Sequence, residues 1–446
     1  MKISPARTRA FDILARIEKE HAYSSILLHT GTENLSDADR GLCYELVLGP
    51  LRRQIYLDQV IKHFAGTKKV DLEVRISLRL GIFQILFLDR IPPHAVINES
   101  VNLVQRAGKS SAKGFVNAIL RNTKSACLEL SFDDPAEKLS VETSHPRWLV
   151  DKWISDFGFE AASEICIANN QPVHPAFRLT ARYYSQFGSG ESSLESMCKF
   201  LGADVGYIKA SESISGCFYA IGRATELRKA ARNGLIYFQD AGSQLVADVV
   251  EFPKNGRFLD LCASPGGKVT KIAADPRYLG AIIISADYNP ARVTNLKANC
   301  ELQGMQRISV MQIDAVKDLP FVERAFDAVL VDAPCTGTGT IRHNPEIRYR
   351  VDGEAISMKK RKQRKMLECA SKAVKIGGSL IYSTCSLERE ENEEVVTSFL
   401  AENQQFTLDR PRVPDRFIRG THFFRTFPSD FEGDGFFAVV FRRNEA

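Results

Sequence analysis

The spacing of apolar residues divides the chain into a helical front part and a longer part in which short strands alternate with helices. In the front part, apolar residues such as Phe11, Leu14 and Ile17 recur at helical spacing. Ser36 to Asp39 offers a helix start, and Pro92 with Pro93 ends the most apolar segment. The helices predicted in this way cover residues 6–28, 40–64, 72–88, 94–108 and 113–122. The first third is therefore predicted to be all-helical, with 72–88 as its buried central helix.

From Gly234 onward the pattern changes to short apolar runs that are rich in β-branched residues. These runs cover residues 258–263, 281–287, 308–314, 326–334 and 378–385, and helical patterns at 290–304 and 358–374 lie between them. This alternation predicts a parallel, doubly wound α/β sheet. The runs 421–428 and 433–443 predict a closing antiparallel hairpin at the sheet edge, with a turn at 432–435.

Residues 126–232 show a third pattern. A helix with an aromatic face carries both tryptophans, Trp148 and Trp153, and stretches of alternating character follow at 177–183 and 218–225. We interpret this region as a linker helix and a small α/β module. The predicted domains are therefore 1–140, 141–232 and 233–446.

Composition narrows the class of protein. Of the 446 residues 44% are hydrophobic and 25% charged, and no apolar run approaches the roughly 20 residues that span a bilayer. The first residues contain no apolar signal segment. The ten cysteines are scattered without a CxxC pair, which argues against a zinc site and a disulfide framework. We expect a cytoplasmic protein without a metal or a membrane partner.

Charge is unevenly distributed along the chain. Residues 1–125 contain 19 Lys and Arg against 12 Asp and Glu, whereas the remainder contains 40 against 42. Within the front part, residues 75–124 contain eight basic residues and two acids. A basic front part on a near-neutral body suggests a polyanionic partner, although solvated faces of a helical bundle would also explain it.

A glycine-containing loop follows the first predicted strand of the sheet. It comprises Cys262, Ala263, Ser264, Pro265, Gly266, Gly267 and Lys268. Ligands bind beyond the carboxyl ends of the strands in such sheets, and glycines let the backbone approach a ligand closely. The GxGxxG and GxxxxGK[ST] motifs are absent, which argues against a dinucleotide and a nucleoside triphosphate.

Acidic residues end the next two predicted strands. Asp287 comes about 20 residues after the glycines, where an acid binds ribose hydroxyls in related folds. Asp314 ends the third strand and is placed to hydrogen-bond an adenine amino group. Either acid alone would favour simple helix capping. A glycine loop followed by one acid per strand end is the layout of a class I methyltransferase, which uses S-adenosylmethionine.

Two cysteines follow the fourth and fifth strands. Cys335 stands in the run Asp332 to Cys335, and Cys385 stands in the run Ser383 to Ser386. Adjacent parallel strands lie roughly 5 Å apart, so both thiols could face one substrate. A lone cysteine at such a position usually serves packing, but two at the ligand-binding edge indicate chemistry.

These motifs resemble the NOL1/NOP2/Sun family of RNA cytosine-5 methyltransferases, and in particular its bacterial Sun/Fmu-type members. The shared runs are 238–245, 259–268, 331–346, 382–393 and 433–440. The runs 93–100 and 114–122, with the early ARTRAFDIL, resemble the NusB-type helical RNA-binding domain. The resemblance covers nearly the whole chain and implies an RNA substrate, 16S ribosomal RNA, for an enzyme expected to be a monomer.

The resemblance also implies roles for individual residues. It makes Cys385 the nucleophile and gives Cys335 a part in releasing the product. Asp332 would hydrogen-bond the base edge, and Lys268 would contact the base or lower a thiol pKa.

Three competing functions are less consistent with the sequence. DNA cytosine-5 methyltransferases use the cysteine of the PC pair as nucleophile, and the STC run at 383–385 argues against that arrangement. A NusB-like assembly factor with a vestigial enzyme domain would be free to lose the two cysteines and the strand-end acids, which are all present. A NAD-dependent enzyme is the most distant of the three, because the GxGxxG motif is missing.

Overall fold

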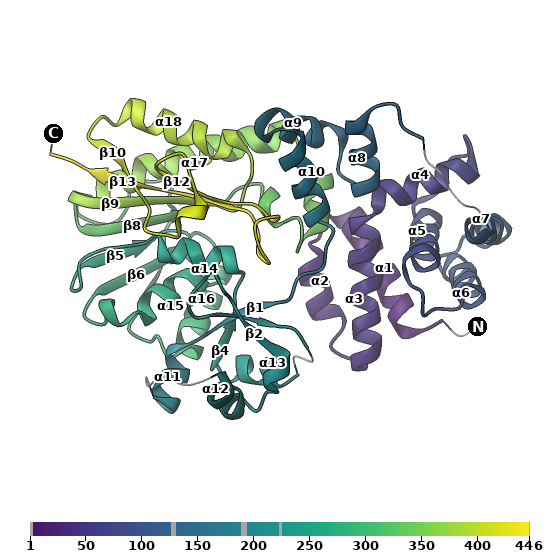
Figure 1. The fold of residues 1–446 in the computed structure, drawn as a ribbon, viewed down its shortest axis with the longest axis horizontal. Helices are drawn as coiled ribbons and strands as arrows, with labels where there is room; N and C mark the ends of the chain where they lie inside the picture. The colour runs from purple at the N-terminus through teal and green to yellow at the C-terminus, as the bar shows by residue number, and fades with distance from the viewer. Residues whose placement is uncertain (1–2, 126–130, 189–193, 223–224, 446) are drawn as a thin grey trace. The chain divides into compact units, whose positions relative to one another are not determined.

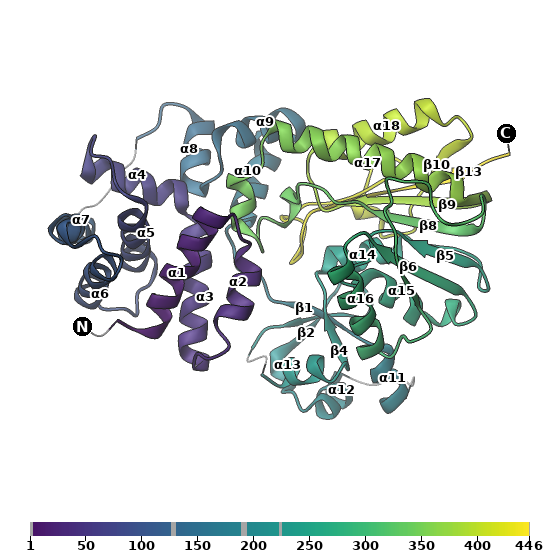
Figure 2. The ribbon, with the colours of Figure 1, turned by 180° about the vertical axis from the view of Figure 1, so that it is seen from behind.

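The computed structural model describes residues 3–125, 131–188, 194–222 and 225–445, which form two compact units. We call the first the helical unit; it comprises Met1–Gln171 and the separate segment Ile341–Arg350. The second, the sheet unit, comprises Pro172–Thr340 and Val351–Ala446. Figures 1 and 2 show the chain from opposite sides. The predicted combination of an all-α front part and a Rossmann-like sheet is confirmed.

Ten α-helices make up the described part of the helical unit. They are α1 (Pro5–Glu20), α2 (Ser24–Gly31), α3 (Asp37–Arg52), α4 (Gln54–Ala65), α5 (Leu72–Phe87), α6 (Pro93–Arg106), α7 (Lys113–Ser125), α8 (Pro135–Thr143), α9 (Arg147–Phe157) and α10 (Phe159–Ala168). The apolar helix α5 is buried over Val74 to Gln84 except at Arg75, as predicted. The Ser36 side chain accepts a hydrogen bond from the Asp39 amide at the start of α3. The expected helix over 6–28 is wrong in its length, because His21 adopts the left-handed conformation and a new helix begins at Ser24.

Residues 341–350 bind the ends of five helices in the helical unit. Glu346 accepts hydrogen bonds from the Ser24 amide (2.8 Å) and hydroxyl (2.9 Å) at the start of α2. At helix C-termini, Arg350 donates to the Ala22 carbonyl just after α1, and Arg348 donates to that of Thr143 at the end of α8. The Tyr349 hydroxyl donates to the Leu51 carbonyl near the end of α3. Arg342 Nε donates to the Ala168 carbonyl at the end of α10.

Helix ends expose carbonyls and amides that have no partner within the helix. Arginine side chains that donate to the last carbonyls also interact favourably with the helix dipole. Residues 341–350 therefore satisfy backbone groups that would otherwise be buried without partners. The helical unit is complete only with a segment that follows Cys335 in the sequence.

We expect Arg348→Ala to destabilise the helical unit by about 3 kcal/mol or more, because buried carbonyls lose a charged donor and a cavity forms. Arg348 is fully buried and also donates to Asn170 Oδ1 at 2.9 Å. Both tryptophans lie in α9, so urea unfolding followed by tryptophan fluorescence reports this unit selectively. Arg147→Ala, which removes two exposed ion pairs with Asp134 and Asp151, is the control and should change stability by less than about 1 kcal/mol. Equal unfolding midpoints for the two variants would contradict the prediction.

The sheet unit is built on a nine-stranded mixed sheet. Its strands are β5 (Arg257–Asp260), β6 (Ile282–Asp287), β7 (Ser309–Gln312), β8 (Phe326–Asp332), β9 (Val374–Thr384), β10 (Phe406–Asp409), β11 (Ile418–Arg419), β12 (Phe423–Thr426) and β13 (Phe436–Arg443). The order β11-β12-β13-β9-β8-β5-β6-β7 places the reversal of strand order between β5 and β8. The five predicted strands are present and pair in parallel, as expected.

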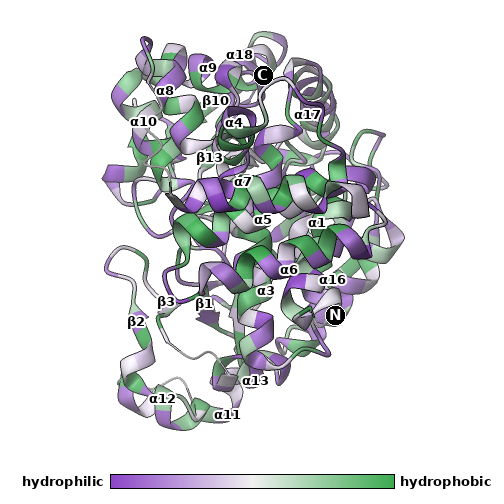
Figure 3. Cartoon of the chain, turned by 90° about the vertical axis from the view of Figure 1, so that its right-hand side faces the viewer, coloured by the Kyte–Doolittle hydropathy of each residue, from purple (hydrophilic) through white to green (hydrophobic). Residues whose placement is uncertain are grey.

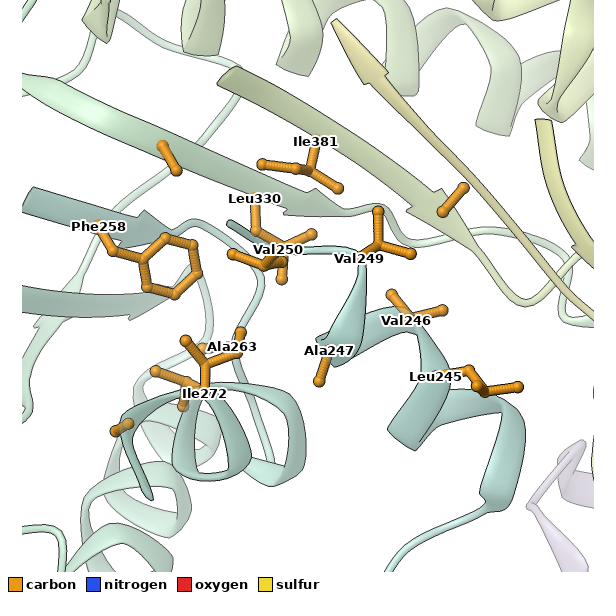
Figure 4. Close-up of a cluster of buried hydrophobic side chains, with 14 of the residues drawn as sticks. Leu245, Val246, Ala247, Val249, Val250, Phe258, Ala263, Ile272, Leu330 and Ile381 are labelled. Atoms are coloured by element: carbon orange, nitrogen blue, oxygen red, sulfur yellow. The ribbon is translucent and has the colours of Figure 1, made fainter. Parts of the chain in front are cut away.

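Helices cover both faces of this sheet (Figure 1). They are α14 (Ala241–Asp248), α15 (Gly267–Ala274) and α16 (Pro290–Leu302) on one face, and α17 (Gly353–Ala373) and α18 (Glu393–Glu402) on the other. Figure 4 shows the core under α14 and α15, where Leu245 and Ile272 lie with Phe258, Leu330 and Ile381 of the strands. Burial of these apolar side chains fixes the positions of the carboxyl ends of β5, β8 and β9 relative to one another.

Two details at the sheet differ from the predictions. The strands β12 and β13 pair antiparallel, but the hairpin is not at the edge, because β13 also pairs with β9 and β11 pairs with β12. Its connection spans 427–435 rather than four residues. Within it, Asp430 accepts a hydrogen bond from the Phe427 amide, and the Thr426 hydroxyl donates to the Asp434 carbonyl. Strand β7 ends at Gln312, two residues before Asp314.

A second, four-stranded antiparallel sheet forms the small α/β module. Its strands, in the order β2-β3-β1-β4, are β1 (Ala176–Leu179), β2 (Ile208–Ala210), β3 (Cys217–Ala220) and β4 (Ile236–Phe238), and its helices are α11 (Ala181–Phe187), α12 (Leu194–Leu201) and α13 (Thr225–Arg232). The predicted stretch 218–225 includes two residues, 223 and 224, that lie outside the described residues. The module packs as part of the sheet unit, whereas α8 to α10 pack in the helical unit. The three-domain division at 140 and 232 stays a prediction.

Two further features concern membranes and thiols. Of the helices within the described ranges, none is long and apolar enough to cross a membrane. The nine described cysteines are free thiols, and Cys127 lies outside the described residues.

Candidate active site

The loop 262–268 follows β5 and continues into the first two residues of α15, as the sequence predicts. Gly266 has φ of 109°, a conformation that favours glycine, and a Cβ there would lie 3.0 Å from a Leu296 methyl group. Gly267 begins α15, and a Cβ at this residue would lie 3.0 Å from the Tyr237 ring. The two glycines therefore allow a close turn into a helix whose amides face the strand ends.

A cavity of about 210 Å³ opens beside this loop. Seven predicted site residues line it: Cys262, Ala263, Ser264, Pro265, Gly267, Lys268 and Asp332. Its other lining residues are Tyr237, Phe238, Gln239, Asp240, Ser243 and Asp260. The loop and the fourth strand thus meet at one site, at the reversal of strand order where ligands of such sheets bind.

Asp260, at the end of β5, is a site residue that the sequence analysis missed. It is 1% exposed, and its Oδ1 accepts a hydrogen bond from the Cys262 amide at 3.3 Å. Its Oδ2 is buried and has no hydrogen-bond partner among the described residues. Burial, followed by the nearby Asp332 carboxylate, raises the pKa of Asp260 to about 8. A buried oxygen without a partner in this cavity indicates a place for a ligand donor. The signal in the sequence was an acid in the run FLDL.

Neither of the two predicted strand-end acids lines the cavity. Asp287 ends β6, is 4% exposed, and its Oδ1 accepts a hydrogen bond from the Asn289 amide at 3.1 Å. The side chain of Asn289, not Asp287, caps the following helix α16. Burial and then the carboxylates of Asp260, Asp332 and Asp287 raise the pKa of Cys262, so Asp287 lies within electrostatic reach of the loop. Asp314 accepts a hydrogen bond from the Val316 amide at 3.3 Å.

Arg178 of the small α/β module hydrogen-bonds the start of α15, where the loop 262–268 ends. It is 3% exposed and donates hydrogen bonds to Gly267 O at 3.0 Å and to the Thr270 hydroxyl at 2.7 Å. Burial lowers the pKa of Arg178 to about 10. The module therefore fixes the first turn of α15, a role that the sequence pattern of β1 did not reveal.

Lys268 and Asp332 form a partly buried ion pair at the cavity wall. Lys268 Nζ lies 2.7 Å from Asp332 Oδ2, and the Ser383 hydroxyl donates to Asp332 Oδ1 at 2.7 Å. Burial alone lowers the pKa of Lys268, but the Asp332 carboxylate outweighs this and raises it overall, with a smaller contribution from Cys385. Lys268 therefore lies within electrostatic reach of Cys385 and links the cavity to the thiols.

The structure brings the two predicted cysteines together. Cys335 Sγ lies 3.4 Å from Cys385 Sγ, in the loops that follow β8 and β9. A Cβ on Gly339 would lie 2.8 Å from Cys385 O, so only glycine lets the first loop approach the second. The hydrogen bond with Cys385, burial and the Glu391 carboxylate together raise the pKa of Cys335.

Glu391 joins the two cysteine loops and was also missed from the sequence, where it stands in an acidic run that is typical of an exposed helix. It is fully buried. Its carboxylate accepts hydrogen bonds from the Thr336 amide (3.0 Å) and hydroxyl, the Ser386 hydroxyl (2.6 Å) and Gln363 Nε2 (2.9 Å). Burial raises the pKa of this carboxyl, although the hydrogen bonds oppose the rise.

The residues present fit S-adenosylmethionine. A glycine turn leads into a helix N-terminus, a buried carboxylate oxygen of Asp260 lacks a partner among the described residues, and a strand-end acid lies one strand away. These features, on a sheet of this topology, define a class I methyltransferase.

Comparisons with known proteins identify the family. Residues 247–442 match the model for 16S rRNA methyltransferase RsmB/F, and residues 4–125 match the NusB family. A probable ribosomal RNA small subunit methyltransferase B of Bacillus subtilis is 33% identical over 99% of this chain and 100% of that protein. The Pseudomonas putida ribosomal RNA small subunit methyltransferase B is 30% identical over 89% of this chain and 88% of that protein. The chain belongs to the ribosomal RNA small subunit methyltransferase B family, and its cofactor is S-adenosylmethionine.

Solved structures share the fold. The crystal structure of PH0851 aligns with a TM-score of 0.81 over 99% of this chain and 100% of that chain, at 23% identity. NSun6 from Pyrococcus horikoshii, solved with SFG, aligns with a TM-score of 0.57 over 68% of this chain and 99% of that chain, at 20% identity. The predicted family, fold class and cofactor are thus confirmed.

We expect Glu391→Gln and Glu391→Ala to have different effects. The glutamine oxygen can still accept hydrogen bonds, and its amide group can donate to the hydroxyl oxygens of Thr336 and Ser386. The two cysteine loops therefore stay joined, but the negative charge is lost. The pKa of Cys335 should fall, and iodoacetamide should label it severalfold faster at pH ~8, as measured by peptide mass spectrometry. Alanine leaves the four donors unpaired and should cost about 2–4 kcal/mol of stability in urea unfolding.

Glu394→Gln is the matched control, because Glu394 is exposed and pairs with Lys360 outside this network. It should change neither the labelling rate nor the stability appreciably. Unchanged labelling of Cys335 in Glu391→Gln would show that the carboxylate does not act on the thiol.

Proposed function

We propose that this enzyme transfers a methyl group from S-adenosylmethionine to C5 of a cytosine in 16S ribosomal RNA, through a covalent bond between Cys385 and C6 of the base. The observation that carries the proposal is the pair of thiols 3.4 Å apart beside the cofactor cavity. The family supports ribosomal RNA as the substrate, and the names of the relatives support its small-subunit RNA.

The substrate explains why a thiol is needed. C5 of cytosine is too electron-poor to accept a methyl group directly. When the Cys385 thiolate adds to C6, the ring becomes an enamine whose C5 is nucleophilic. S-adenosylmethionine supplies the methyl group as an electrophilic sulfonium. Loss of the C5 proton then lets the Cys385–C6 bond break, which restores the aromatic ring and the free thiolate.

Cys335 acts in this release step. Its raised pKa keeps it a thiol while Cys385 adds to C6; once Cys335 has given that proton to solvent, its thiolate is a base strong enough to take the C5 proton, which regenerates the thiol. Asp332, held by Lys268 and Ser383, hydrogen-bonds the N3 and N4 edge of the base from the cavity wall. Lys268 provides a positive charge within electrostatic reach of Cys385.

The cofactor would be held by the loop and by the acids around it. Gly266 and Gly267 admit the backbone to close contact, and Asp260 Oδ2 is available for a donor of the cofactor. Asp287 is the carboxylate for the ribose hydroxyls, and Asp314 is the acceptor for the adenine amino group. The other loop residues, Cys262 to Pro265, line the same cavity.

We expect Asp287→Ala to weaken binding of S-adenosylmethionine at least tenfold. Hydrogen bonds to an ionised acceptor contribute about 1.5–3 kcal/mol each, and about 1.4 kcal/mol corresponds to tenfold in affinity. Isothermal titration calorimetry measures the change. Asp318→Ala, which removes an exposed carboxylate paired with Lys372, is the control. Unchanged affinity in Asp287→Ala would remove this residue from the site.

We expect the two cysteine variants to fail in different ways. Cys385→Ala lacks the attacking thiolate, so neither methylation nor a covalent complex should form. Cys335→Ala keeps the nucleophile but impairs release, so a protein–RNA adduct should accumulate and survive denaturing electrophoresis. Bisulfite sequencing of 16S ribosomal RNA and gel analysis of the complex measure the two effects.

Cys369→Ala, at a buried thiol on α17 away from the loops, is the control for loss of a cysteine and should resemble the natural enzyme. Trapping of RNA by Cys385→Ala but not by Cys335→Ala would invert the assignment in favour of the DNA-type arrangement. Loss of activity in both variants without any trapped RNA would overturn the two-cysteine scheme.

A further inference from the structure

The two thiols of the site lie close enough to react with each other. Cys335 Sγ and Cys385 Sγ are 3.4 Å apart, although 50 residues separate the two cysteines in the sequence. Of the nine described thiols, only these two contact each other. A disulfide bond is about 2.05 Å long, so the sulfur atoms need to approach by only about 1.4 Å to form one.

The backbone holds both cysteine loops at the spacing that a disulfide requires. Asp332 and Ser383 are Cα partners on the neighbouring parallel strands β8 and β9, and such strands lie about 4.8 Å apart. The Cα atoms of disulfide-bonded cysteines are usually about 4.4–6.8 Å apart. Beyond the strand ends, the Gly339 amide still donates to Cys385 O at 2.9 Å. The loops therefore stay side by side past the thiols, and a bond between the sulfur atoms leaves the fold unchanged.

The Cys335 loop is also anchored to α17, which is labelled in Figure 3. Gln363 of this helix donates to Pro334 O at 3.3 Å and to Glu391 Oε1 at 2.9 Å. Glu391 in turn accepts hydrogen bonds from both cysteine loops. None of these contacts uses a sulfur atom, so they remain when the thiols are oxidised.

The paired thiols are also among the more accessible ones. Cys335, Cys385 and Cys262 are partly exposed, whereas the other six described cysteines are buried. Oxidation of a thiol depends on its exposure and on its thiolate character. A small oxidant therefore reaches these three cysteines first, and only Cys335 and Cys385 have a second thiol in contact.

We propose that Cys335 and Cys385 form a modification site at which hydrogen peroxide converts the two thiols into a reversible disulfide. The Cys385 thiolate attacks one peroxide oxygen, the O–O bond breaks, and Cys385 becomes a sulfenic acid. The hydroxide that leaves takes up the proton that Cys385 lost. Cys335 Sγ then attacks Cys385 Sγ, and its proton leaves with the displaced hydroxyl group as water. Two thiols thus lose two electrons and two protons, and one peroxide becomes two waters.

The disulfide would switch the enzyme off reversibly. This consequence rests on the proposed function, in which the Cys385 thiolate must add to C6 of the base. While Cys385 Sγ is bonded to Cys335, it has no thiolate to add. A disulfide is reduced by other thiols, whereas a sulfinic acid is not. Cys335 therefore protects the nucleophile from irreversible oxidation, in addition to its part in releasing the product.

Peptide mass spectrometry detects the bond directly. Trypsin releases residues 325–342 and 376–389 as separate peptides with one cysteine each, because Lys or Arg precedes and ends both of them. After the full-length enzyme is treated with hydrogen peroxide and its remaining thiols are alkylated, the two peptides should be joined, at the sum of their masses less two hydrogen atoms. Dithiothreitol should separate them again. Cys369→Ala, which removes a buried thiol on α17, is the control and should give the same joined peptides.

Cys335→Ala tests whether Cys335 protects Cys385. In this variant the Cys385 sulfenic acid has no partner thiol, so peroxide should convert it to the sulfinic acid. Peptide 376–389 should then be two oxygen atoms heavier, and dithiothreitol should not reverse the change. The natural enzyme under the same conditions should contain the disulfide instead. This measurement does not depend on methyl transfer.

Methylation of a 16S ribosomal RNA transcript is measured on the same samples. Activity should fall in proportion to the joined fraction of the peptides and return with dithiothreitol. Absence of the joined peptides, or equal amounts of sulfinic acid in the natural enzyme and in Cys335→Ala, would overturn the modification site. If the joined peptides form but the reduced enzyme methylates no cytosine, or the disulfide-bonded enzyme still methylates it, the modification site stands and the proposed reaction fails.

Discussion

The parallel pairing of β8 with β9 is the constraint on which the reactive site depends. Asp332 pairs with Ser383 in this ladder, and their side chains are hydrogen-bonded. Cys335 and Cys385 follow within three residues, so the thiols are brought together by backbone geometry and not by their own weak attraction. A shift of the β8–β9 register by one residue would turn every side chain of one strand to the other face of the sheet. It would separate Asp332 from Ser383 and Cys335 from Cys385.

Around this ladder the site is built from buried and partly buried charges that are held by hydrogen bonds. Glu391, Asp332 and Lys268 each face polar partners from other elements, and the unmatched oxygen of Asp260 faces the cavity. Burying these groups costs free energy unless their hydrogen bonds are well placed. In return, the hydrogen-bond network makes the site rigid, because hydrogen bonds in a low-dielectric environment hold these side chains in one arrangement before the substrate binds.

The sequence predicted those parts of the site that depend on local pattern. A glycine loop after a strand, acids at strand ends and two cysteines at neighbouring strand ends have a regular spacing that follows from the parallel sheet. Glu391 and Arg178 were missed because their roles arise from tertiary contacts: one stands in an acidic run and the other in a short strand of a separate module. The break at His21 was missed because helical periodicity continues across it.

The segment 341–350 has a role that no local sequence pattern shows. In sequence it continues the loop of Cys335, yet its side chains satisfy helix ends of the NusB-like unit. A fragment that ends at residue 140 or 171 would leave the amide of Ser24 and the last carbonyls of α1 and α3 without these partners. Buried backbone groups without hydrogen-bond partners cost free energy of folding. The helical unit therefore depends on residues 341–350 and is not an independent module.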